Sequence, residues 1–272
     1  MEQRFTFDGV AGLYGDARPT YPESVFDDIA AFSGLGSKDA ILEIGCGTGQ
    51  ATQDFAHRGF SILALEPGKE LIGIARKKLG GFPDIHFAET TFEAWPGEPE
   101  TFKLVMAAQS FHWVAPEVRF AKTAEQLAPG GTLAIFGNVP MPPASPLAAE
   151  FACLYSRYAP SLSGPPAEAW YLPDGPFAKL LGESKYFEPA THRSYPWSRT
   201  HNAASYTDLL RTLSRYRLLP DDRREALLAA IAEVIAAYGG VLELRYETHL
   251  YMAKRRRESR PAASHRAGTA FR

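Results

Sequence analysis

The chain has 272 residues, of which 45% are hydrophobic and 22% are charged, and its formal net charge is −2 at pH 7. These values are ordinary for a folded protein of one large or two small domains, and they exclude a strong overall attraction to nucleic acid or to an anionic membrane. Two cysteines, no apolar core at the N-terminus and no apolar run that could cross a bilayer predict a cytoplasmic protein without a disulfide framework or a membrane segment.

The N-terminal segment, residues 1–22, predicts an irregular arm because residues 8–22 are rich in glycine and proline. Residues 23–32 then carry apolar side chains at helical spacing, and Gly34 follows them. The arm is therefore expected to lead into the first helix of the folded domain.

Residues 40–50 read AILEIGCGTGQ and predict a buried strand followed by a glycine turn. Gly45, Gly47 and Gly49 occupy alternate positions of this turn, where glycine permits unusual backbone angles and the close approach of a ligand. A helix is predicted to start at Gln50. Strand, glycine turn and helix together present backbone N–H groups to a nucleotide-like ligand.

Glu66 follows a second predicted strand, residues 61–65. An acid at the tip of a second strand, about 20 residues beyond a glycine turn, accepts hydrogen bonds from ribose hydroxyls. Dinucleotide enzymes require glycine or alanine where this chain has Gln50, so an NAD-dependent oxidoreductase is the less favoured alternative.

Strands and helices continue to alternate as far as residue 138. The pattern predicts a helix at 69–79, strands at 85–89 and 102–108, a helix at 116–127 and a strand at 132–136. This order is typical of an α/β fold with a doubly wound, mostly parallel sheet.

Beyond residue 138 the rhythm changes, because prolines interrupt the chain repeatedly. Residues 139–175 and 200–240 are interpreted as insertions that form a helical cap, with a helix over 205–219. Strands are predicted at 190–197 and 241–252. Residues 254–272 are basic and poor in apolar side chains, which predicts a disordered tail. Nucleic-acid binding by this tail is disfavoured because no aromatic residues are interleaved with its short basic run.

Three motifs resemble a known family. The pattern E-x-G-x-G-x-G at residues 43–49 is similar to motif I of the class I S-adenosylmethionine-dependent methyltransferases. Residues 14–22 (Y-x-x-x-R-P-x-Y-P) and 107–113 (A-x-Q-S-F-H-W) resemble the branch related to trans-aconitate methyltransferase. The resemblance implies a single Rossmann-like methyltransferase domain over residues 1–253, with a helical cap insertion and an antiparallel last strand.

The resemblance also implies S-adenosyl-L-methionine as cofactor. The arm would fold over it with Arg18 on its carboxylate, since guanidinium grips a carboxylate in two places. Thr91 and Phe92 would flank the adenine, although core packing explains Phe92 equally well. Gln109 would contact the cofactor or support its loop. The expected cofactor-binding residues are Tyr14, Arg18, Glu43, Gly45, Cys46, Gly47, Gly49, Glu66, Thr91, Phe92 and Gln109.

The expected acceptor is a small molecule, and a carboxylic acid is the leading hypothesis, with esterification as the chemistry. The cap region offers cations at Arg193, Arg199, Arg211, Arg215 and Arg217. Arg211 and Arg215 are four apart on a predicted helix and would share one face. His112 is a candidate general base, or else a structural histidine.

No sequence pattern for a metal site or a nucleophilic triad is present. Two alternatives remain open: a non-catalytic protein of the same fold that binds the cofactor or a partner, and the oxidoreductase. The sequence does not decide the oligomeric state.

Overall fold

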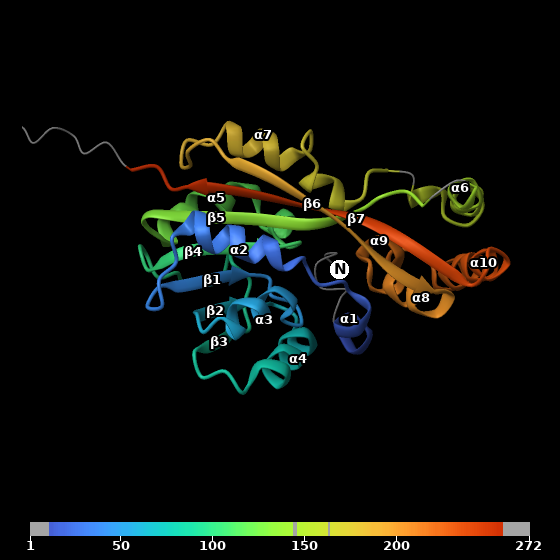
Figure 1. The fold of residues 1–272 in the computed structure, drawn as a ribbon, viewed down its shortest axis with the longest axis horizontal. Coiled ribbons are helices and arrows are strands. Elements are labelled where there is room, and N and C mark those ends of the chain that lie inside the picture. Colours follow the sequence, from blue (N-terminus) through green and yellow to red (C-terminus); the bar gives the residue numbers. More distant parts are fainter. Residues whose placement is uncertain (1–10, 144–145, 163, 258–272) are drawn as a thin grey trace, which may run out of the picture.

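A computed structural model describes residues 11–143, 146–162 and 164–257 of the chain. At its centre is a seven-stranded sheet with the strand order β3-β2-β1-β4-β5-β7-β6 (Figure 1). The strands are β1 (Ala40–Ile44), β2 (Ser61–Leu65), β3 (Ile85–Ala88), β4 (Phe102–Ala108), β5 (Leu127–Pro140), β6 (Thr191–Asn202) and β7 (Val241–Lys254).

Helices surround this sheet. The α-helices are α1 (Ala11–Ala17), α2 (Glu23–Ser33), α3 (Gln50–His57), α4 (Lys69–Leu79), α5 (Pro116–Gln126), α6 (Leu147–Tyr158), α7 (Pro176–Gly182), α8 (Ala203–Thr212), α9 (Ser214–Arg217) and α10 (Asp221–Ala237). The short 3₁₀ helices include η3 (Phe111–Trp113), η4 (Pro160–Leu162) and η5 (Ala167–Tyr171).

The strands β1 to β5 form the parallel part of the sheet, with β1 between β2 and β4. Neighbouring residues of β1 enter different cores, as the two-residue period of a strand requires: Ile41 packs with α2 and α3, whereas Leu42 packs on the opposite face with α5 and α7. Both side chains are fully buried. A strand covered on both faces explains the nearly continuous apolar run in its sequence.

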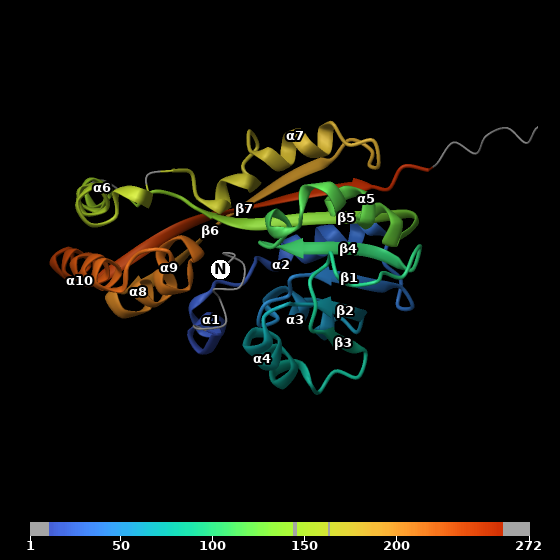
Figure 2. The ribbon, with the colours of Figure 1, turned by 180° about the vertical axis from the view of Figure 1, so that it is seen from behind.

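The C-terminal strand β7 runs antiparallel to both of its neighbours, β5 and β6. The prediction of a doubly wound, mostly parallel sheet with an antiparallel last strand is therefore confirmed. Strand β6 is longer than its sequence predicted and continues to Asn202. The paired β6 and β7 extend beyond the other strands towards α8 and α10 (Figures 1 and 2).

A third hydrophobic core lies at this extension. Buried side chains of α6, α8, α9 and α10 meet there against the ends of β6 and β7. Phe151 and Tyr206 stack with 5.9 Å between ring centroids, and Ile231 is fully buried. Residues of both segments that the sequence assigns to a cap, 139–175 and 200–240, contribute to this core. We call these two segments the cap from here on.

The prediction of a single helix over 205–219 is wrong, because the helix is interrupted at Leu213. Leu213 has extended backbone angles, with φ −79° and ψ 128°, so α8 ends at Thr212 and α9 begins at Ser214. The side chain of Arg18 donates a hydrogen bond of 2.8 Å to the Thr212 carbonyl, which has no partner within the helix at this end. Arg211 and Arg215 consequently lie on different helices and do not share a face.

The basic tail begins later than predicted. Lys254 is the last residue of β7, and its Nζ donates to Thr132 Oγ1 at 2.9 Å. Arg255 forms an ion pair of 3.0 Å with Glu100, and its backbone N–H donates to the Gly131 carbonyl. Assigning these two residues to a disordered tail was wrong, because a basic composition does not show that the alkyl stem and backbone continue a strand. Residues 258–272 lie outside the described residues.

The third core predicts a large effect of one substitution in α10. Leu227 is fully buried there, so Leu227→Ala is expected to lower the free energy of unfolding by about 2–5 kcal/mol through the cavity it leaves. Leu218→Ala makes the same chemical change at a side chain that is 60% exposed, and should cost less than about 1 kcal/mol. Denaturant unfolding of both variants tests this, and equal losses would contradict the core assignment.

Candidate functional site

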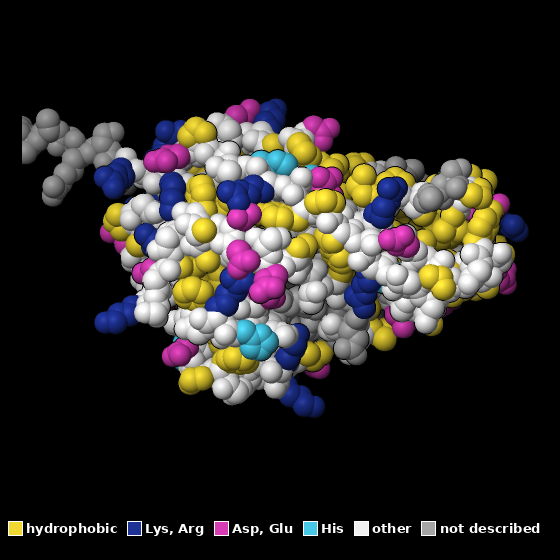
Figure 3. Space-filling model, viewed as in Figure 1, with side chains coloured by type: hydrophobic (Ala, Val, Ile, Leu, Met, Phe, Trp, Pro, Cys, Tyr) yellow, Lys and Arg dark blue, Asp and Glu magenta, His cyan; other side chains and the backbone are white. Residues whose placement is uncertain are grey.

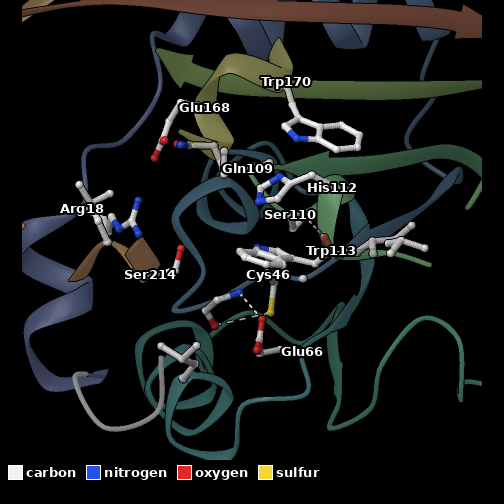
Figure 4. A pocket seen from close by; sticks show the side chains of 18 of the residues that line it. Arg18, Cys46, Glu66, Gln109, Ser110, His112, Trp113, Glu168, Trp170 and Ser214 are labelled. Atoms are coloured by element: carbon white, nitrogen blue, oxygen red, sulfur yellow. Dashed lines mark hydrogen bonds between the residues drawn. The ribbon is translucent and has the colours of Figure 1, made fainter. Parts of the chain in front are cut away.

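A cavity of about 630 Å³ lies where the parallel strands end. Its lining combines segments that follow β1, β2, β3 and β4 with cap segments from residues 161–162, 164–171 and 213–219. In an open parallel sheet the carboxyl ends of the strands are the usual ligand site. Figure 4 shows side chains from both sources directed into this pocket.

The glycine turn is shaped by a close contact with the segment after β4. Gly45 has φ +71°, and a Cβ added to it would lie 2.6 Å from Ser110 Cβ. Gly47 also has positive φ, and both glycines line the pocket. Gly49 does not: its missing Cβ leaves room for Leu79 of α4, at 2.9 Å. Two of the three glycines thus lie at the expected site, and the third packs α3 against α4.

Cys46 lies in the turn between the two pocket glycines and is 5% exposed. Burial raises the pKa of its thiol well above the ordinary value, and the negative charges of Glu43 and Glu66 raise it further. The thiol stays protonated at neutral pH. It therefore contributes a small side chain to the pocket surface, and not a nucleophile.

Glu66 connects the two turns that border the pocket. One carboxylate oxygen accepts from the Gly47 N–H at 2.9 Å and the other from the Gly68 N–H at 2.8 Å. Each oxygen has a second lone pair, so the carboxylate retains the capacity to accept from ligand hydroxyls. This geometry is compatible with the predicted ribose contact.

Glu43 is 1% exposed and also lines the pocket. Its Oε2 accepts from the Thr52 hydroxyl at 2.6 Å, while Oε1 has no hydrogen-bond partner among the described residues. Burial raises the pKa of this carboxyl to about 7, against the opposing effect of Thr52 and helped by the charge of Glu66. The site thus holds a buried acceptor that is only partly ionised at neutral pH.

Gln50, which the sequence marks only as a departure from the dinucleotide pattern, lines the same part of the pocket. Its Nε2 is a buried donor without a partner among the described residues. An acceptor on Glu43 and a donor on Gln50, both without partners among the described residues, fit a ligand that carries an ammonium or hydroxyl groups together with a carboxylate. S-adenosylmethionine has these groups, so the residues present fit the predicted cofactor.

The arm contributes Arg18, which lines the pocket and points into it in Figure 4. Its guanidinium lies between the pocket and α8, where it donates to Thr212 as described above. The backbone of Tyr14 belongs to α1, but its side chain lies outside the described part of the structure. The predicted contact of Tyr14 with the cofactor therefore stays a prediction.

Gln109 links the arm to the end of β4. It accepts a hydrogen bond of 3.3 Å from the Tyr21 hydroxyl, and its backbone N–H donates to the Phe136 carbonyl at 2.8 Å. Its φ of +51° is rare for a residue with a side chain and is typical of strained positions at functional sites. Gln109 lines the pocket and supports the surrounding loop, so both expected roles are compatible with its position.

Thr91 and Phe92 lie in the turn after β3, on the pocket lining. The hydroxyl of Thr91 accepts from the Ala94 N–H at 3.1 Å and starts this turn. Phe92 is 3% exposed and stacks on Trp95, with 6.3 Å between ring centroids. Both rings belong to the core that contains Leu42, on the face of the sheet covered by α5 and α7. The packing role of Phe92 is therefore present, and one edge of the side chain still reaches the pocket.

His112 lies on the pocket lining, half-buried, with Nδ1 3.3 Å from the Tyr171 hydroxyl. Desolvation lowers the pKa of its imidazole to about 3, and the positive charges of Arg119 and Arg18 lower it further. The ring is neutral at physiological pH. A base with so low a pKa accepts protons poorly, so the environment disfavours the predicted catalytic role.

Arg119, which the sequence analysis missed, joins two parts of the pocket. It is 3% exposed and donates to the carbonyls of His112 and Val114 at 3.2 and 2.7 Å. Its guanidinium lies 5.1 Å from the ring centroid of Trp170 in η5. No pattern in the sequence indicates this role, because an arginine in an amphipathic helix is normally exposed.

The described residues contain neither a cluster of potential metal ligands nor a membrane-spanning helix. Among them, no group of three or more histidine, cysteine, aspartate or glutamate side chains is arranged to hold a metal ion. No described helix combines the length and apolar character required to cross a bilayer. On the face shown in Figure 3, positive and negative side chains of the described residues are interspersed, and no basic stripe is visible.

The clash at Gly45 gives a testable expectation. Gly34 and Gly45 both have positive φ, but space around Gly34 is open, so Gly34→Ala should cost about 1–2 kcal/mol of backbone strain alone. Gly45→Ala adds the contact with Ser110, and should lower stability further and weaken S-adenosylhomocysteine binding at least about tenfold. Calorimetry and thermal unfolding of both variants provide the measurement; equal behaviour would contradict the close-approach argument.

The raised pKa of Glu43 predicts a pH-dependent affinity. A ligand that donates to Glu43 must displace its proton below pH 7, so the dissociation constant of S-adenosylhomocysteine should rise by up to about tenfold per pH unit between pH 7 and 5.5. Glu43→Gln should bind more weakly at pH 8 and remove this part of the slope. An unchanged slope in the variant would show that Glu43 does not meet the ligand.

Comparison with known proteins also indicates a methyltransferase. A family model described as a methyltransferase domain matches residues 41–131. A methyltransferase-like protein of Schizosaccharomyces pombe is 26% identical over 92% of this chain and 95% of its own. The trans-aconitate 2-methyltransferase of Rhizobium meliloti is 27% identical over 71% and 76%, respectively. Relatives in Mycobacterium tuberculosis are matched over only 54% of their length.

The fold has solved counterparts. A putative type II methyltransferase from Anaeromyxobacter dehalogenans superposes with a TM-score of 0.62, at 20% identity, over 87% of this chain and 97% of that one. The methyltransferase match includes the glycine turn, Glu66 and the loop after β3, and so favours methyl transfer over nicotinamide chemistry. We conclude that the chain is an S-adenosylmethionine-dependent methyltransferase with a class I, Rossmann-like fold.

Proposed function

We propose that this methyltransferase esterifies a small molecule that bears a carboxylate. The observation that carries the proposal is the state of Arg215, whose guanidinium lies on the pocket lining. It donates to the backbone carbonyls of Leu162 and Gly164, and no carboxylate pairs with it among the described residues. A half-buried cation on a pocket lining without an acidic partner favours an anionic ligand.

Two other arginines that the sequence nominated are engaged away from the pocket. Arg211 pairs with Asp208 at 3.0 Å and with Glu225 at 2.9 Å. Arg193 pairs with Asp28 on α2. Neither lines the pocket, in contrast to Arg215 and Arg18. Of the five arginines that the sequence nominated, only Arg215 is on the lining, so it is the cap cation that we assign to the acceptor.

Size and enclosure favour a small acceptor. The cavity of about 630 Å³ falls within the range of ordinary small-molecule sites, about 300–1,000 Å³. Cap residues lie across it from the glycine turn, and we propose that the cap covers the site during transfer. The relative from Rhizobium meliloti, named for methylation of trans-aconitate, adds support for an acid as acceptor.

The proposed chemistry requires no general base. Bound S-adenosylmethionine supplies a methyl group made electrophilic by the adjacent sulfonium. A carboxylate oxygen forms a bond to the methyl carbon as the carbon–sulfur bond breaks, and the electron pair stays on sulfur. Since the carboxylate is already ionised, no proton moves, which agrees with a neutral His112 of low pKa. The residues contribute by binding and orienting the acceptor.

The test uses labelled S-adenosylmethionine and a small-molecule extract. The expected product is a methyl ester, recognised by its release of methanol under alkali. Arg215→Ala should raise the acceptor KM about 10- to 100-fold by removing a charged hydrogen-bond donor, with cofactor affinity unchanged. Arg215→Lys should restore part of the loss.

Arg211→Ala is the matched control, because it removes a cap arginine that is absent from the pocket lining. Its acceptor KM should stay within about twofold of the wild type. Transfer to a neutral amine or phenol that requires His112 would refute the carboxylate assignment, while the methyltransferase class would stand.

A further inference from the structure

The acceptor side of the pocket also contains a negative charge. Glu168 in η5 lines the cavity and is half-buried. Among the described residues, no hydrogen-bond donor and no cation pairs with its carboxylate. Figure 4 shows the side chain directed into the pocket, in a region where Arg18 also projects.

The other carboxylates on the lining already have partners. Glu66 accepts from two backbone N–H groups, Glu93 accepts from the Ala115 N–H at 2.9 Å, and Glu43 accepts from Thr52. All three belong to segments at the ends of the parallel strands. Glu168 differs in both respects, because it stands on the cap and faces the acceptor region.

The position of Glu168 is fixed by the packing of η5. Tyr171, in the same short helix, is fully buried, and its ring lies 2.9 Å from where a Cβ on Gly137 of β5 would be. The guanidinium of Arg119 packs against the ring of Trp170, 5.1 Å from its centroid. The backbone that carries Glu168 is thus anchored to the sheet, which limits the region that its carboxylate can reach.

The electrostatics of a nearby phenol, Tyr246, provide a second observation on the charge of Glu168. The Tyr246 phenol, 5% exposed, has a pKa raised mainly by burial. The positive charges of Arg199 and Arg18 lower that pKa, and the charge of Glu168 raises it. Arg18 and Glu168 both act on the pKa of this phenol and both line the pocket, so the pocket contains charges of both signs.

A ligand that fills this pocket removes water from Glu168. A buried carboxylate without a donor is unfavourable, and a ligand that presents only a carboxylate adds repulsion. A ligand that presents a hydroxyl or an ammonium to Glu168 removes both penalties. Sites built around a buried polar group reject analogues that lack its partner far more strongly than apolar pockets reject a missing methylene.

We propose that Glu168 selects an acceptor that carries a hydrogen-bond donor, a hydroxyl or an ammonium, beside the carboxylate that is methylated. The acceptor class is then a hydroxy acid or an amino acid. This inference rests on the proposed function, since Arg215 is taken to hold the carboxylate. The aromatic lining near His112 and Trp170 provides room for a planar apolar part of the same molecule.

Two matched series of acids test the proposal as acceptors for the full-length enzyme. One comprises 3-phenylpropanoate, 3-phenyllactate and phenylalanine; the other comprises succinate, malate and aspartate. Within a series only the substituent beside a carboxylate changes, from hydrogen to hydroxyl to ammonium. In at least one series, kcat/KM for methyl ester formation should be at least tenfold higher for a donor-bearing acid than for the plain acid.

Variants of Glu168 assign that preference to its carboxylate. Glu168→Ala should reduce the preference to within about threefold for both donors. Glu168→Gln keeps an accepting oxygen, so it should retain the hydroxyl preference and lose the ammonium preference. Glu150→Gln, at an exposed cap acid away from the pocket, should change neither. Cofactor affinity should be the same in all variants.

The outcomes separate this inference from the proposed function. Equal kcat/KM for plain and donor-bearing acids, or a preference that survives in Glu168→Ala, overturns the role of Glu168 and leaves esterification standing. A methyl ester from the extract that carries no donor beside its carboxylate does the same. Failure of every acid, in both series and in the extract, overturns the proposed function and this inference together.

Discussion

The close approach of two turns at the end of the parallel sheet determines the shape of the whole site. Strands β1 and β4 are neighbours and parallel, so their following turns emerge at one edge and must pass each other. The missing side chain of Gly45 permits contact with Ser110, whose hydroxyl donates to the Ile44 carbonyl. This contact places the glycine turn beside the segment that carries Gln109 and His112. Cofactor and acceptor regions are consequently adjacent.

The second constraint is the long antiparallel pair of β6 and β7. These strands continue past the rest of the sheet, and the third hydrophobic core packs against their extended ends. Arg18 connects this part to the arm through the carbonyl at the end of α8. The break after α8 turns α9, with Arg215, towards the cavity. The cap thus supplies the acceptor side with charges that the sheet does not provide.

Burial pushes two ionisable groups of the pocket towards their neutral forms. It raises the pKa of Glu43 to about 7 and lowers that of His112 to about 3. The imidazole loses its value as a base, while the carboxyl becomes sensitive to a ligand that donates to it. A site with a neutral histidine and an arginine that has no acidic partner among the described residues suits a nucleophile that arrives already charged. The proposed esterification follows from this balance.

Local pattern was sufficient for the parallel half of the fold. The apolar run of β1, the glycine turn and the alternation of strands and helices depend on spacing along the chain, and a parallel sheet brings strand ends together automatically. Most of the expected site residues accordingly line one pocket, from Glu43 to Gln109. The exception among those expected residues whose placement is described is Gly49, which packs against α4, because the alternate glycines of the turn face different neighbours.

Only the tertiary structure decided the acceptor side. The sequence offers Arg211 and Arg215 as equivalent cations on one helix, yet an extended residue separates them, and acids neutralise the first alone. Arg119 and Glu168 carry no sequence signal, since their roles depend on partners that they meet, or lack, after folding. Whether a charge is paired, buried or directed into a cavity is set by contacts between distant segments. That is why the sequence determined the fold and the cofactor, while the folded cap determined the charges available to the acceptor.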